Sequence, residues 1–467
     1  MTREAAADAS DAQCIEVVND VVRFAASAGD AGKRRHQTSE QSDRQLAELD
    51  QLQRTAAGAR DPEMLLAALL LGQPGDRSAH DASRQTMLLD LGTQAASSGS
   101  PLLAWHALRN CAAAGNACPI AHLEQELLDL QRRNAEAWAL VAMLRYRRRD
   151  VPGALAAMQG AARAPTATWH WPETVEAVER RVAAHTRITF PDSAATAFGA
   201  AAVAVPDLSA FDAMCKMESA SSRAWAESCL AFARLRQEHN ESQLARAVAY
   251  STRRQALQDL GDQEGAEEAR FAYELYSVQS LAGGRDLVNA GARLADILLT
   301  TGRPAFLDYL AAVRRSDELQ GQREFLRQQA PAMLEQAGLS GREAARECIA
   351  ELFLEPRPVG ESRQEVLEHR LQAGEELRIS LRDSSGARVS TPLGRRIGPD
   401  GMVQLAGGLS LPAAGLTTGQ LQRDLAAALS AGPQAVEILV IPIARLSGKE
   451  LRTAFDAAHS AQPATAR

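Results

Sequence analysis

The sequence predicts a mostly α-helical protein in which an array of helical hairpins precedes a small C-terminal α+β domain. Apolar residues recur at helical spacing over most of the first 355 positions, and glycine or proline separates these stretches. Between Gly374 and Ile441, by contrast, alternating and β-branched segments flank a single amphipathic helix. We therefore expect a large helical region and a much smaller mixed region.

Composition limits the class of protein. A chain of 467 residues is longer than one hydrophobic core usually serves, which predicts two or three domains. The net charge of −7 argues against a DNA or RNA partner, because nucleic-acid binding depends on cations that neutralise phosphates. No apolar run has the length of a membrane helix, so no integral membrane segment is expected. No secretion signal is visible after Met1.

Five consecutive segments are predicted along the chain. They are a partly ordered helical leader (1–60), a helical region (61–355), a linker with a bridging helix (356–370), the α+β domain (371–446) and a tail (447–467). Asp61 followed by Pro62 marks the start of the helical region, because a capping residue precedes a proline that suits the first helical turn. A break is expected near 166–206, where the helical pattern is interrupted.

The helical region shows signs of internal repetition. Trp105 and Trp138 are 33 residues apart, and Ala121 and Ala154 follow them at the same offset. An Asp precedes an Ala by four positions twice, at Asp150/Ala154 and at Asp262/Ala266. This pattern resembles degenerate tetratricopeptide repeats, in which a small residue lets two helices of a hairpin pack closely. The resemblance implies a scaffold that binds protein partners; the alternative is an irregular helical domain.

The first half of the C-terminal region predicts two strands. Leu377, Ile379 and Leu381 alternate with polar residues, the period of a strand with one buried face. Pro399-Asp400-Gly401 is a turn signal, and the apolar run Met402-Val403-Gln404-Leu405 follows it. We expect one strand that contains Leu377, Ile379 and Leu381 and a second strand over 402–405, after the turn.

The second half predicts a helix and a closing strand. Thr417 and Gln420 have the spacing of a capping box, so a helix should begin there. A β-branched run from Val436 to Ile441 predicts the last strand. The inner face of the helix should pack on the strands, with Leu421, Leu425 and Leu429 against Leu377, Ile379, Ile438 and Val440.

This order of segments resembles the polysaccharide export domain of outer-membrane exporters of capsule and exopolysaccharide. The matching segments are Gly374–Ile379, Pro399–Gly401, Ala414–Thr417 and Val436–Val440. The resemblance implies a non-enzymatic part of a polysaccharide secretion system in the periplasm or cell envelope. It also implies contact with polysaccharide or exporter subunits and assembly into a homo-oligomer. The alternative is an unrelated small α+β domain in a cytoplasmic helical-repeat adaptor.

Two sets of residues are candidates for contact with glycan or partner. The first set carries the resemblance, although most of its members suit turns and caps; it comprises Gly374, Glu375, Pro399, Asp400, Gly401, Gly415 and Thr417. The second set is Trp169 and Trp171, because aromatic faces bind the apolar faces of sugars. The alternative for these two tryptophans is a packed corner beside Pro172.

Six cysteines provide the remaining signal. Cys111 with Cys118, and Cys215 with Cys229, flank short connectors between helical stretches, and both pairs are candidate disulfides. Two disulfides favour an oxidising compartment, whereas buried free thiols would suit the cytoplasm. No zinc-type Cys or His spacing, phosphate-binding loop or nucleophile elbow is present. We therefore predict no catalytic, cofactor-binding or metal site.

Overall fold

The structure is a computed structural model. The chain forms two compact units. The structure describes residues 13–24, 39–56, 59–72, 82–111, 120–204, 206–281, 291–294, 296, 302–355, 357–360, 362–382, 393–405, 408–429, 437–444 and 446–461. Unit 1 comprises Met1–Gly29, Arg270–Leu298 and Arg323–Arg467, and unit 2 comprises Asp30–Ala269 and Leu299–Gln322. Both units are therefore built from separate stretches of sequence.

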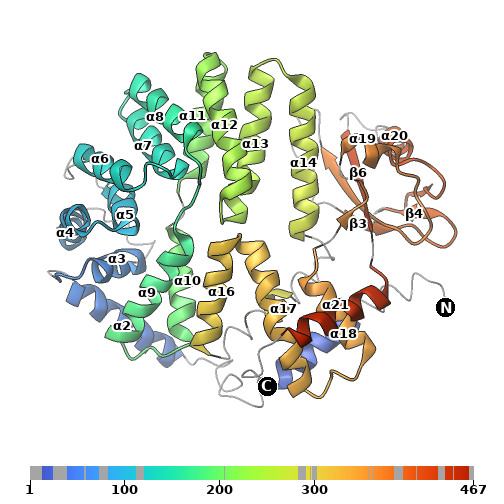
Figure 1. The fold of residues 1–467 in the computed structure, drawn as a ribbon, viewed down its shortest axis with the longest axis horizontal. Helices are drawn as coiled ribbons and strands as arrows, with labels where there is room; N and C mark the ends of the chain where they lie inside the picture. The colour runs from blue at the N-terminus through green and yellow to red at the C-terminus, as the bar shows by residue number, and fades with distance from the viewer. Residues whose placement is uncertain are drawn as a thin grey trace. The chain divides into compact units, whose positions relative to one another are not determined.

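Unit 2 is helical throughout its described part (Figure 1). Its helices are α2 (Ser39–Ala56), α3 (Pro62–Leu71), α4 (Ala82–Ser98), α5 (Pro101–Cys111), α6 (Ile120–Leu130), α7 (Ala135–Arg147), α8 (Val151–Arg163), α9 (Trp171–His185), α10 (Asp192–Val203), α11 (Leu208–Ser219), α12 (Arg223–His239), α13 (Gln243–Asp259) and α16 (Arg303–Arg315). Two further helices, α14 (Gln263–Leu281) and α17 (Glu318–Gln336), begin in unit 2 and continue into unit 1. The predicted predominance of helix is confirmed for the described residues.

Aspartate caps start several of these helices. The Asp61 side chain accepts hydrogen bonds from the backbone amides of Glu63 and Met64, at 3.0 and 3.3 Å, and Pro62 occupies the first turn. This cap satisfies amides that have no partner inside the helix. The predicted entry into α3 is confirmed.

The two predicted Asp-to-Ala spacings correspond to the same local structure. Asp150 accepts from the amide of Gly153 at 2.9 Å, and Asp262 accepts from the amide of Gly265 at 2.8 Å. The alanines one position further on, Ala154 and Ala266, are both buried. Each spacing thus marks a capped helix start whose fourth residue, an alanine, enters the core.

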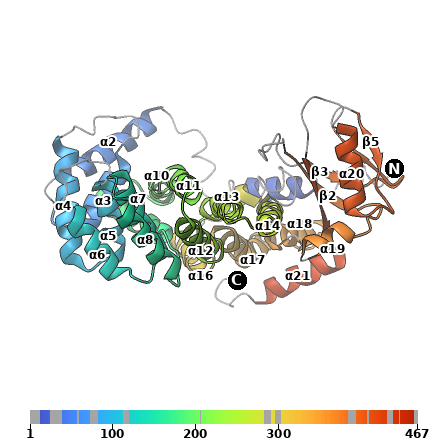
Figure 2. The same cartoon turned by 90° about the horizontal axis from the view of Figure 1, so that it is seen from above.

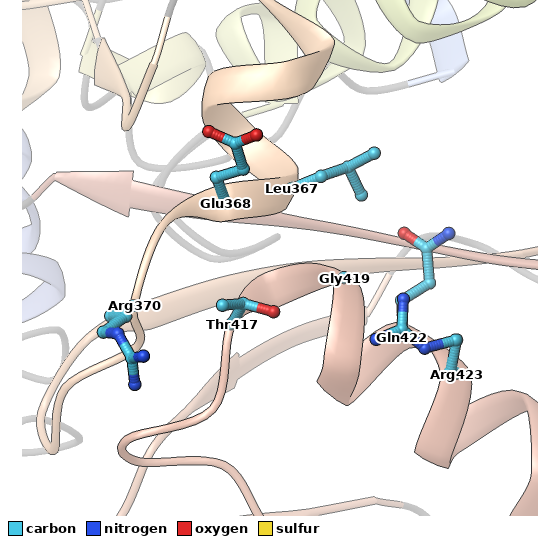
Figure 3. Close-up of a pocket in the computed structure, with 7 residues that line it drawn as sticks. All are labelled: Leu367, Glu368, Arg370, Thr417, Gly419, Gln422 and Arg423. Atoms are coloured by element: carbon cyan, nitrogen blue, oxygen red, sulfur yellow. The ribbon is translucent and has the colours of Figure 1, made fainter.

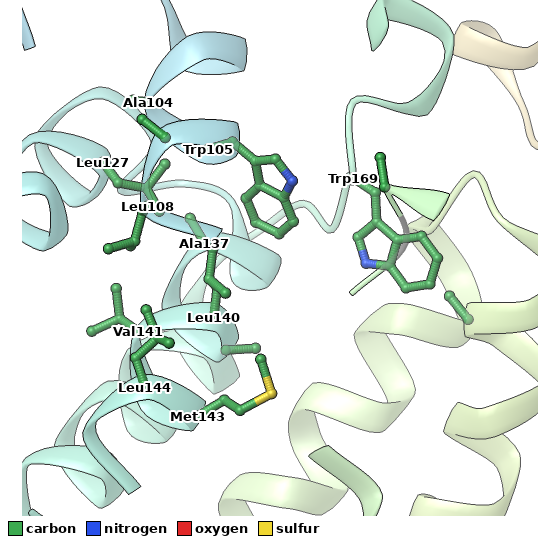
Figure 4. Packing of buried hydrophobic residues seen from close by; sticks show 14 of the residues in the cluster. Ala104, Trp105, Leu108, Leu127, Ala137, Leu140, Val141, Met143, Leu144 and Trp169 are labelled. Atoms are coloured by element: carbon green, nitrogen blue, oxygen red, sulfur yellow. The ribbon is translucent and has the colours of Figure 1, made fainter. Parts of the chain in front are cut away.

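Close helix approach shapes the core of unit 2. A Cβ atom on Gly160 of α8 would lie 2.5 Å from the indole ring of Trp138 on α7, so a larger residue would push the two helices apart. On α7, Leu140 and Val141 are buried and belong to the same cluster as Leu108 of α5 (Figure 4). Alanine, glycine and leucine thus provide the packing in a chain with few aromatic residues.

The segment 166–206, predicted as a break, is instead part of the core of unit 2. Its helices α9 and α10 pack on each other, and α9 also contacts α3 and α16. Val175, Val178 and Val182 of α9 are fully buried. The proline-rich corner changes the chain direction before α9 but does not separate two domains.

Unit 1 combines helices with a small mixed region. Its elements are the helical residues 13–24, the Arg270–Leu281 part of α14, most of α17, α18 (Glu343–Phe353), β1 (Arg357–Pro358), α19 (Arg363–Glu368), β2 (Glu376–Arg382), β3 (Leu393–Arg396), β4 (Met402–Gln404), β5 (Ser410–Pro412), α20 (Thr418–Leu429), β6 (Glu437–Ala444) and α21 (Gly448–Ser460). Helices α19 and α20 lie beside the strands (Figure 2). A small C-terminal α+β region is therefore present.

The strands form two antiparallel sheets. Four strands have the order β1-β6-β2-β3, and β4 pairs with β5 in a second sheet. The central pair has Leu377 opposite Pro442 and Ile379 opposite Val440. The predicted strands correspond to β2, β4 and β6, whereas β1, β3 and β5 were not predicted.

Strand β6 is buried on both faces. Ile438 and Val440 share a cluster with Leu421 and Leu425 of α20, as the sequence predicts. The alternate residues Leu439, Ile441 and Ile443 share a different cluster with Phe271 of α14 and Val366 of α19. A strand covered on both sides needs a continuous apolar run, which β6 has.

The second face of the sheet explains why the chain does not divide near 356–370. Phe271 and Leu275 of α14 pack on that face, and Ser380 of β2 donates a hydrogen bond to the buried Glu274 carboxylate at 2.8 Å. The segment 371–446 therefore depends on helical residues that lie about a hundred positions earlier. The predicted boundary differs from the observed one because local sequence patterns carry no record of this contact.

The predicted leader and tail are also integrated into the fold. The helical residues 13–24 bury four valines, and Cys14 lies at disulfide distance from Cys348 of α18, with Cα atoms 5.1 Å apart. Helix α21 packs on α18, where Arg452 pairs with Glu347. Residues 39–56 belong to unit 2 as α2. The described parts of 1–60 and 447–467 are thus structural elements of the two units.

Replacing Leu425 by Ala should destabilise unit 1 by about 2–5 kcal/mol, because it leaves a cavity between α20 and the sheet. The neighbouring exposed substitution Asp424→Ala serves as the control. Thermal unfolding followed by limited proteolysis should show an early loss of unit 1 and survival of unit 2. Identical melting of the two variants would contradict the assigned packing.

Removing the Cys14–Cys348 pair by a double Ser substitution should cost about 2–5 kcal/mol, because the pair closes a sequence separation of 334 residues. The matched variant lacks Cys215 and Cys229, which are separated by 14 residues and therefore restrict the unfolded chain less. Thermal unfolding without reductant should show the larger decrease in Tm for the first variant. Equal decreases would contradict this explanation.

Candidate functional site

A groove between α19 and α20 is the candidate functional site in the described part of unit 1. Its volume is about 510 Å³ (Figure 3), and it is lined by Leu367, Glu368, Arg370, Thr417, Gly419, Gln422 and Arg423. We call it the α19–α20 groove. Among the residues predicted from the sequence to contact a ligand, Thr417 lies in this lining.

Two capping boxes position the walls of the groove. Ser362 and Glu365 exchange side-chain and backbone hydrogen bonds at the start of α19. At the start of α20, the Thr417 hydroxyl accepts from the Gln420 amide at 3.2 Å, and the Gln420 side chain accepts from the Thr417 amide at 2.7 Å. The predicted capping box is therefore present. Each box satisfies backbone donors at a helix end that faces solvent.

Backbone contacts hold the two helices together. The Thr418 amide donates to the His369 carbonyl at 2.9 Å, and the Leu371 amide donates to the Leu416 carbonyl at 2.9 Å. A Cβ atom on Gly419 would lie 3.2 Å from the Leu367 carbonyl oxygen, which is tighter than ordinary packing. Glycine at this position therefore permits the close approach that shapes the groove.

The charged side chains of the groove differ in whether a hydrogen bond within the protein already engages them. Arg370 donates to the Gly415 carbonyl oxygen at 3.1 Å and points away from Arg423 (Figure 3). Glu368 accepts from Gln364 at 2.9 Å. Arg423 lies beside Gln422 and is exposed. The groove thus offers an exposed guanidinium and an amide next to the apolar Leu367 side chain.

The groove lining combines one carboxyl group with guanidinium, amide, hydroxyl and apolar groups. A glycosidase needs two carboxyl groups on opposite sides of the bond that it cleaves, and the lining of the groove supplies one, Glu368. No group of His, Cys, Asp and Glu suited to a metal ion occurs among the described residues. The lining therefore offers apolar contact, hydrogen bonding and charges of both signs, from Glu368 and from the arginines.

The other predicted residues of this region stabilise turns. Glu375 accepts from His369 Nε2 at 3.0 Å and from the Gln372 amide at 3.0 Å. Asp400 accepts from the Met402 amide at 3.0 Å, directly after Pro399. The three glycines of the set, Gly374, Gly401 and Gly415, have φ values of +90°, +79° and +86°, which other residues rarely adopt. These positions lie outside the lining of the groove, and of them Gly415 contacts it through the hydrogen bond from Arg370.

The two predicted tryptophans lie in unit 2, outside the groove. The Trp169 side chain is 3% exposed, so its ring is closed to a sugar. The Trp171 ring packs on Phe198 with centroids 5.6 Å apart and is partly buried. The packed corner, the alternative stated for the sequence, describes Trp169, and the glycan contact of Trp171 stays a prediction.

Cysteine pairing agrees in part with the sequence. Cys215 and Cys229 lie at disulfide distance, with Cα atoms 6.0 Å apart, as predicted. Cys118 lies outside the described residues, so its pairing with Cys111 stays a prediction. The Cys14–Cys348 pair was missed, because residues 334 positions apart carry no local signal of contact.

Comparison with known proteins does not identify a family. No protein-family model matches the chain, and searches of curated proteins and of solved structures find no match either. Within the described residues, no helix has both the length and the apolar character needed to cross a bilayer. The function must therefore be argued from the groove and the cysteines.

Substituting Thr417 by Ala should destabilise the start of α20 by about 1 kcal/mol, because the Gln420 amide loses its acceptor. Thr417→Ser retains the hydroxyl and should keep most of the stability. Chemical denaturation monitored by circular dichroism measures both variants. Equal loss in both would show that the methyl group of Thr417, and not the cap, matters.

Proposed function

We propose that the protein is a non-enzymatic part of a polysaccharide secretion system in the cell envelope, and that its α19–α20 groove contacts an acidic polysaccharide. The observation that carries this proposal is the exposed Arg423 guanidinium beside Leu367 and Thr417. A sugar ring presents apolar C–H faces, and an acidic sugar adds a carboxylate that a guanidinium binds well. The order of segments that resembles a polysaccharide export domain supports the same choice.

The cysteines support the compartment in this proposal. Two described pairs, Cys14–Cys348 and Cys215–Cys229, lie at disulfide distance. Disulfides persist in oxidising compartments such as the periplasm and are rare in the cytoplasm. Mass spectrometry of non-reduced peptides from the native source tests this point, since free thiols at these four positions would favour the cytoplasm.

A second candidate function is a helical adaptor that binds protein partners. The matching capped junctions at Asp150 and Asp262, and the contact of Gly160 with Trp138, favour a repeat-like array of helical hairpins. Such arrays present extended surfaces to partners. In the proposed system the helical unit would bind other exporter subunits or a second copy of the chain.

Arg423→Ala should weaken binding to a uronate-containing polysaccharide about tenfold or more, because one charge-assisted contact is lost. Arg363→Ala is the matched control: it removes the same charge from α19 without changing the lining of the groove. Isothermal titration calorimetry with acidic and neutral polysaccharides measures the effect. Equal affinities of the two variants would reject the groove as the site.

Failure of the unmodified protein to bind any acidic or neutral polysaccharide would reject the proposed function itself. Light scattering after size exclusion adds an independent measurement. A homo-oligomer is expected from the resemblance to an export domain, and a strict monomer that also binds no polysaccharide would favour the adaptor.

A further inference from the structure

A buried carboxylate in unit 2 caps a helix that is distant in sequence. Glu241 lies in the turn between α12 and α13 and is 5% exposed. Its Oε1 atom accepts from the amides of Trp169 and Trp171, at 2.6 and 3.3 Å, and from the Thr168 hydroxyl at 3.1 Å. His170, the residue before α9, makes no side-chain cap of its own. Glu241 therefore performs the capping role for α9 from another part of the chain.

The second oxygen of this carboxylate, Oε2, is buried away from water, and no hydrogen bond from the described residues replaces the lost contact with water. Glu241 Oε2 has no hydrogen-bond partner among the described residues. A buried ionised oxygen without a partner is costly, so the protonated form is favoured. Burial raises the pKa of Glu241 to about 7, and the nearby Glu136 carboxylate acts in the same direction. The amides that Glu241 caps oppose this shift, but burial outweighs them.

The charged groups around Glu241 are already engaged with each other. Arg236 of α12 forms two hydrogen bonds of 2.7 Å with Glu136 of α7, and Asn240 adds a third at 2.9 Å. Arg236 is therefore committed to Glu136, although its Nη1 atom has no partner among the described residues. Trp169, which Glu241 holds through its amide, lies with its ring 5.9 Å from the Arg236 guanidinium (Figure 4 shows Trp169).

Groups on the other neighbouring elements do not neutralise Glu241 either. His170 bonds to Gln131 at 2.8 Å, and burial lowers its pKa, so it is neutral near pH 7. On the α17 side, the Glu318 amide donates to the Glu241 carbonyl at 2.8 Å, and burial raises the pKa of the Glu318 carboxylate. The remaining charges form pairs, at Asp317 with Arg246 and at Glu173 with Arg314.

We infer that loss of the Glu241 proton loosens the contact between residues 168–171 and the α12–α13 turn, which makes the start of α9 a pH-responsive joint of unit 2. In the protonated state the carboxyl group caps α9 without a buried charge. In the ionised state the same cap requires an uncompensated charge in the core. The segment then opens more often, because opening exposes Oε2 to water.

The direction of the pH effect follows from the two states of the carboxyl group. Below the ordinary pKa of 4.5, Glu241 is protonated in both the folded and the unfolded chain, so its contribution to stability does not change with pH. Between 4.5 and about 7 the unfolded chain loses the proton first, and the stability of the fold decreases as pH rises. Above about pH 7 the loss is complete and amounts to roughly a 300-fold larger unfolding constant.

Hydrogen exchange of full-length protein, followed by mass spectrometry, tests this inference. The variant Glu241→Gln keeps a carbonyl oxygen for the Trp169 amide and removes the charge. Comparing it with wild type at one pH cancels the intrinsic effect of pH on exchange. For peptides that cover 166–171, the exchange rate of wild type divided by that of Glu241→Gln should rise about thirtyfold between pH 5.5 and pH 8.5.

The control is Glu238→Gln, which removes an exposed charge from the end of α12, three residues before Glu241, and should behave as wild type. A wild-type to Glu241→Gln ratio that is the same at both pH values would show a purely structural cap and overturn the inference. If Glu241→Gln does not fold, the test uses wild-type protein alone. Its exchange is measured across the pH range and corrected for the intrinsic exchange rates. Loss of protection confined to 166–171 with a midpoint near pH 7 supports the joint, and constant protection rejects it.

Discussion

The buried ion pair between Glu136 and Arg236 is the contact on which the helical unit depends. Both side chains are 2% exposed, and the two bonds of 2.7 Å join α7 to α12. Removing one partner of such a pair typically costs about 3–5 kcal/mol, because a charge is left in the core. The guanidinium also lies over Phe232 at 4.4 Å and Phe211 at 4.7 Å, so α11 is held to the same point. The capping carboxylate of Glu241 follows five residues later in the chain.

The mixed region depends on a different constraint: strand β6 is packed against other elements on both of its faces. Helix α20 covers one face, and Phe271 and Leu275 pack on the other, so neither the strand nor its neighbours can bury their apolar surface alone. The α19–α20 groove lies where α20 meets the short α19 at the rim of this arrangement. Its shape therefore depends on how firmly α20 is seated on the sheet, which links Leu421 and Leu425 to the properties of the groove.

Local signals in the sequence were sufficient for some elements and insufficient for others. Leu377 and Ile379 predict β2 because alternation is a property of neighbouring residues, and the Thr417–Gln420 cap predicts α20 for the same reason. Strand β3 has the sequence Leu-Gly-Arg-Arg, which shows no alternation, and it forms through pairing with β2. Of the groove, Thr417 was predicted, whereas Arg423 and Leu367 meet through tertiary packing that no motif records. An aromatic pair such as Trp169 and Trp171 allows both a sugar contact and a packed corner in sequence, and the burial of Trp169 decides for the corner at that residue.

The discontinuous make-up of unit 1 determines an order of events during synthesis. The helical residues 13–24 emerge before unit 2, but their partner in α18 is more than 300 residues away in the chain. All of unit 2 is synthesised in between, and domains generally fold as they emerge. The four valines and the thiol of the first helix thus stay without their native partners for most of translation. Helix 13–24 therefore waits longest for its native partners. A chaperone has the most time to bind its valines, and another thiol has the most time to react with Cys14.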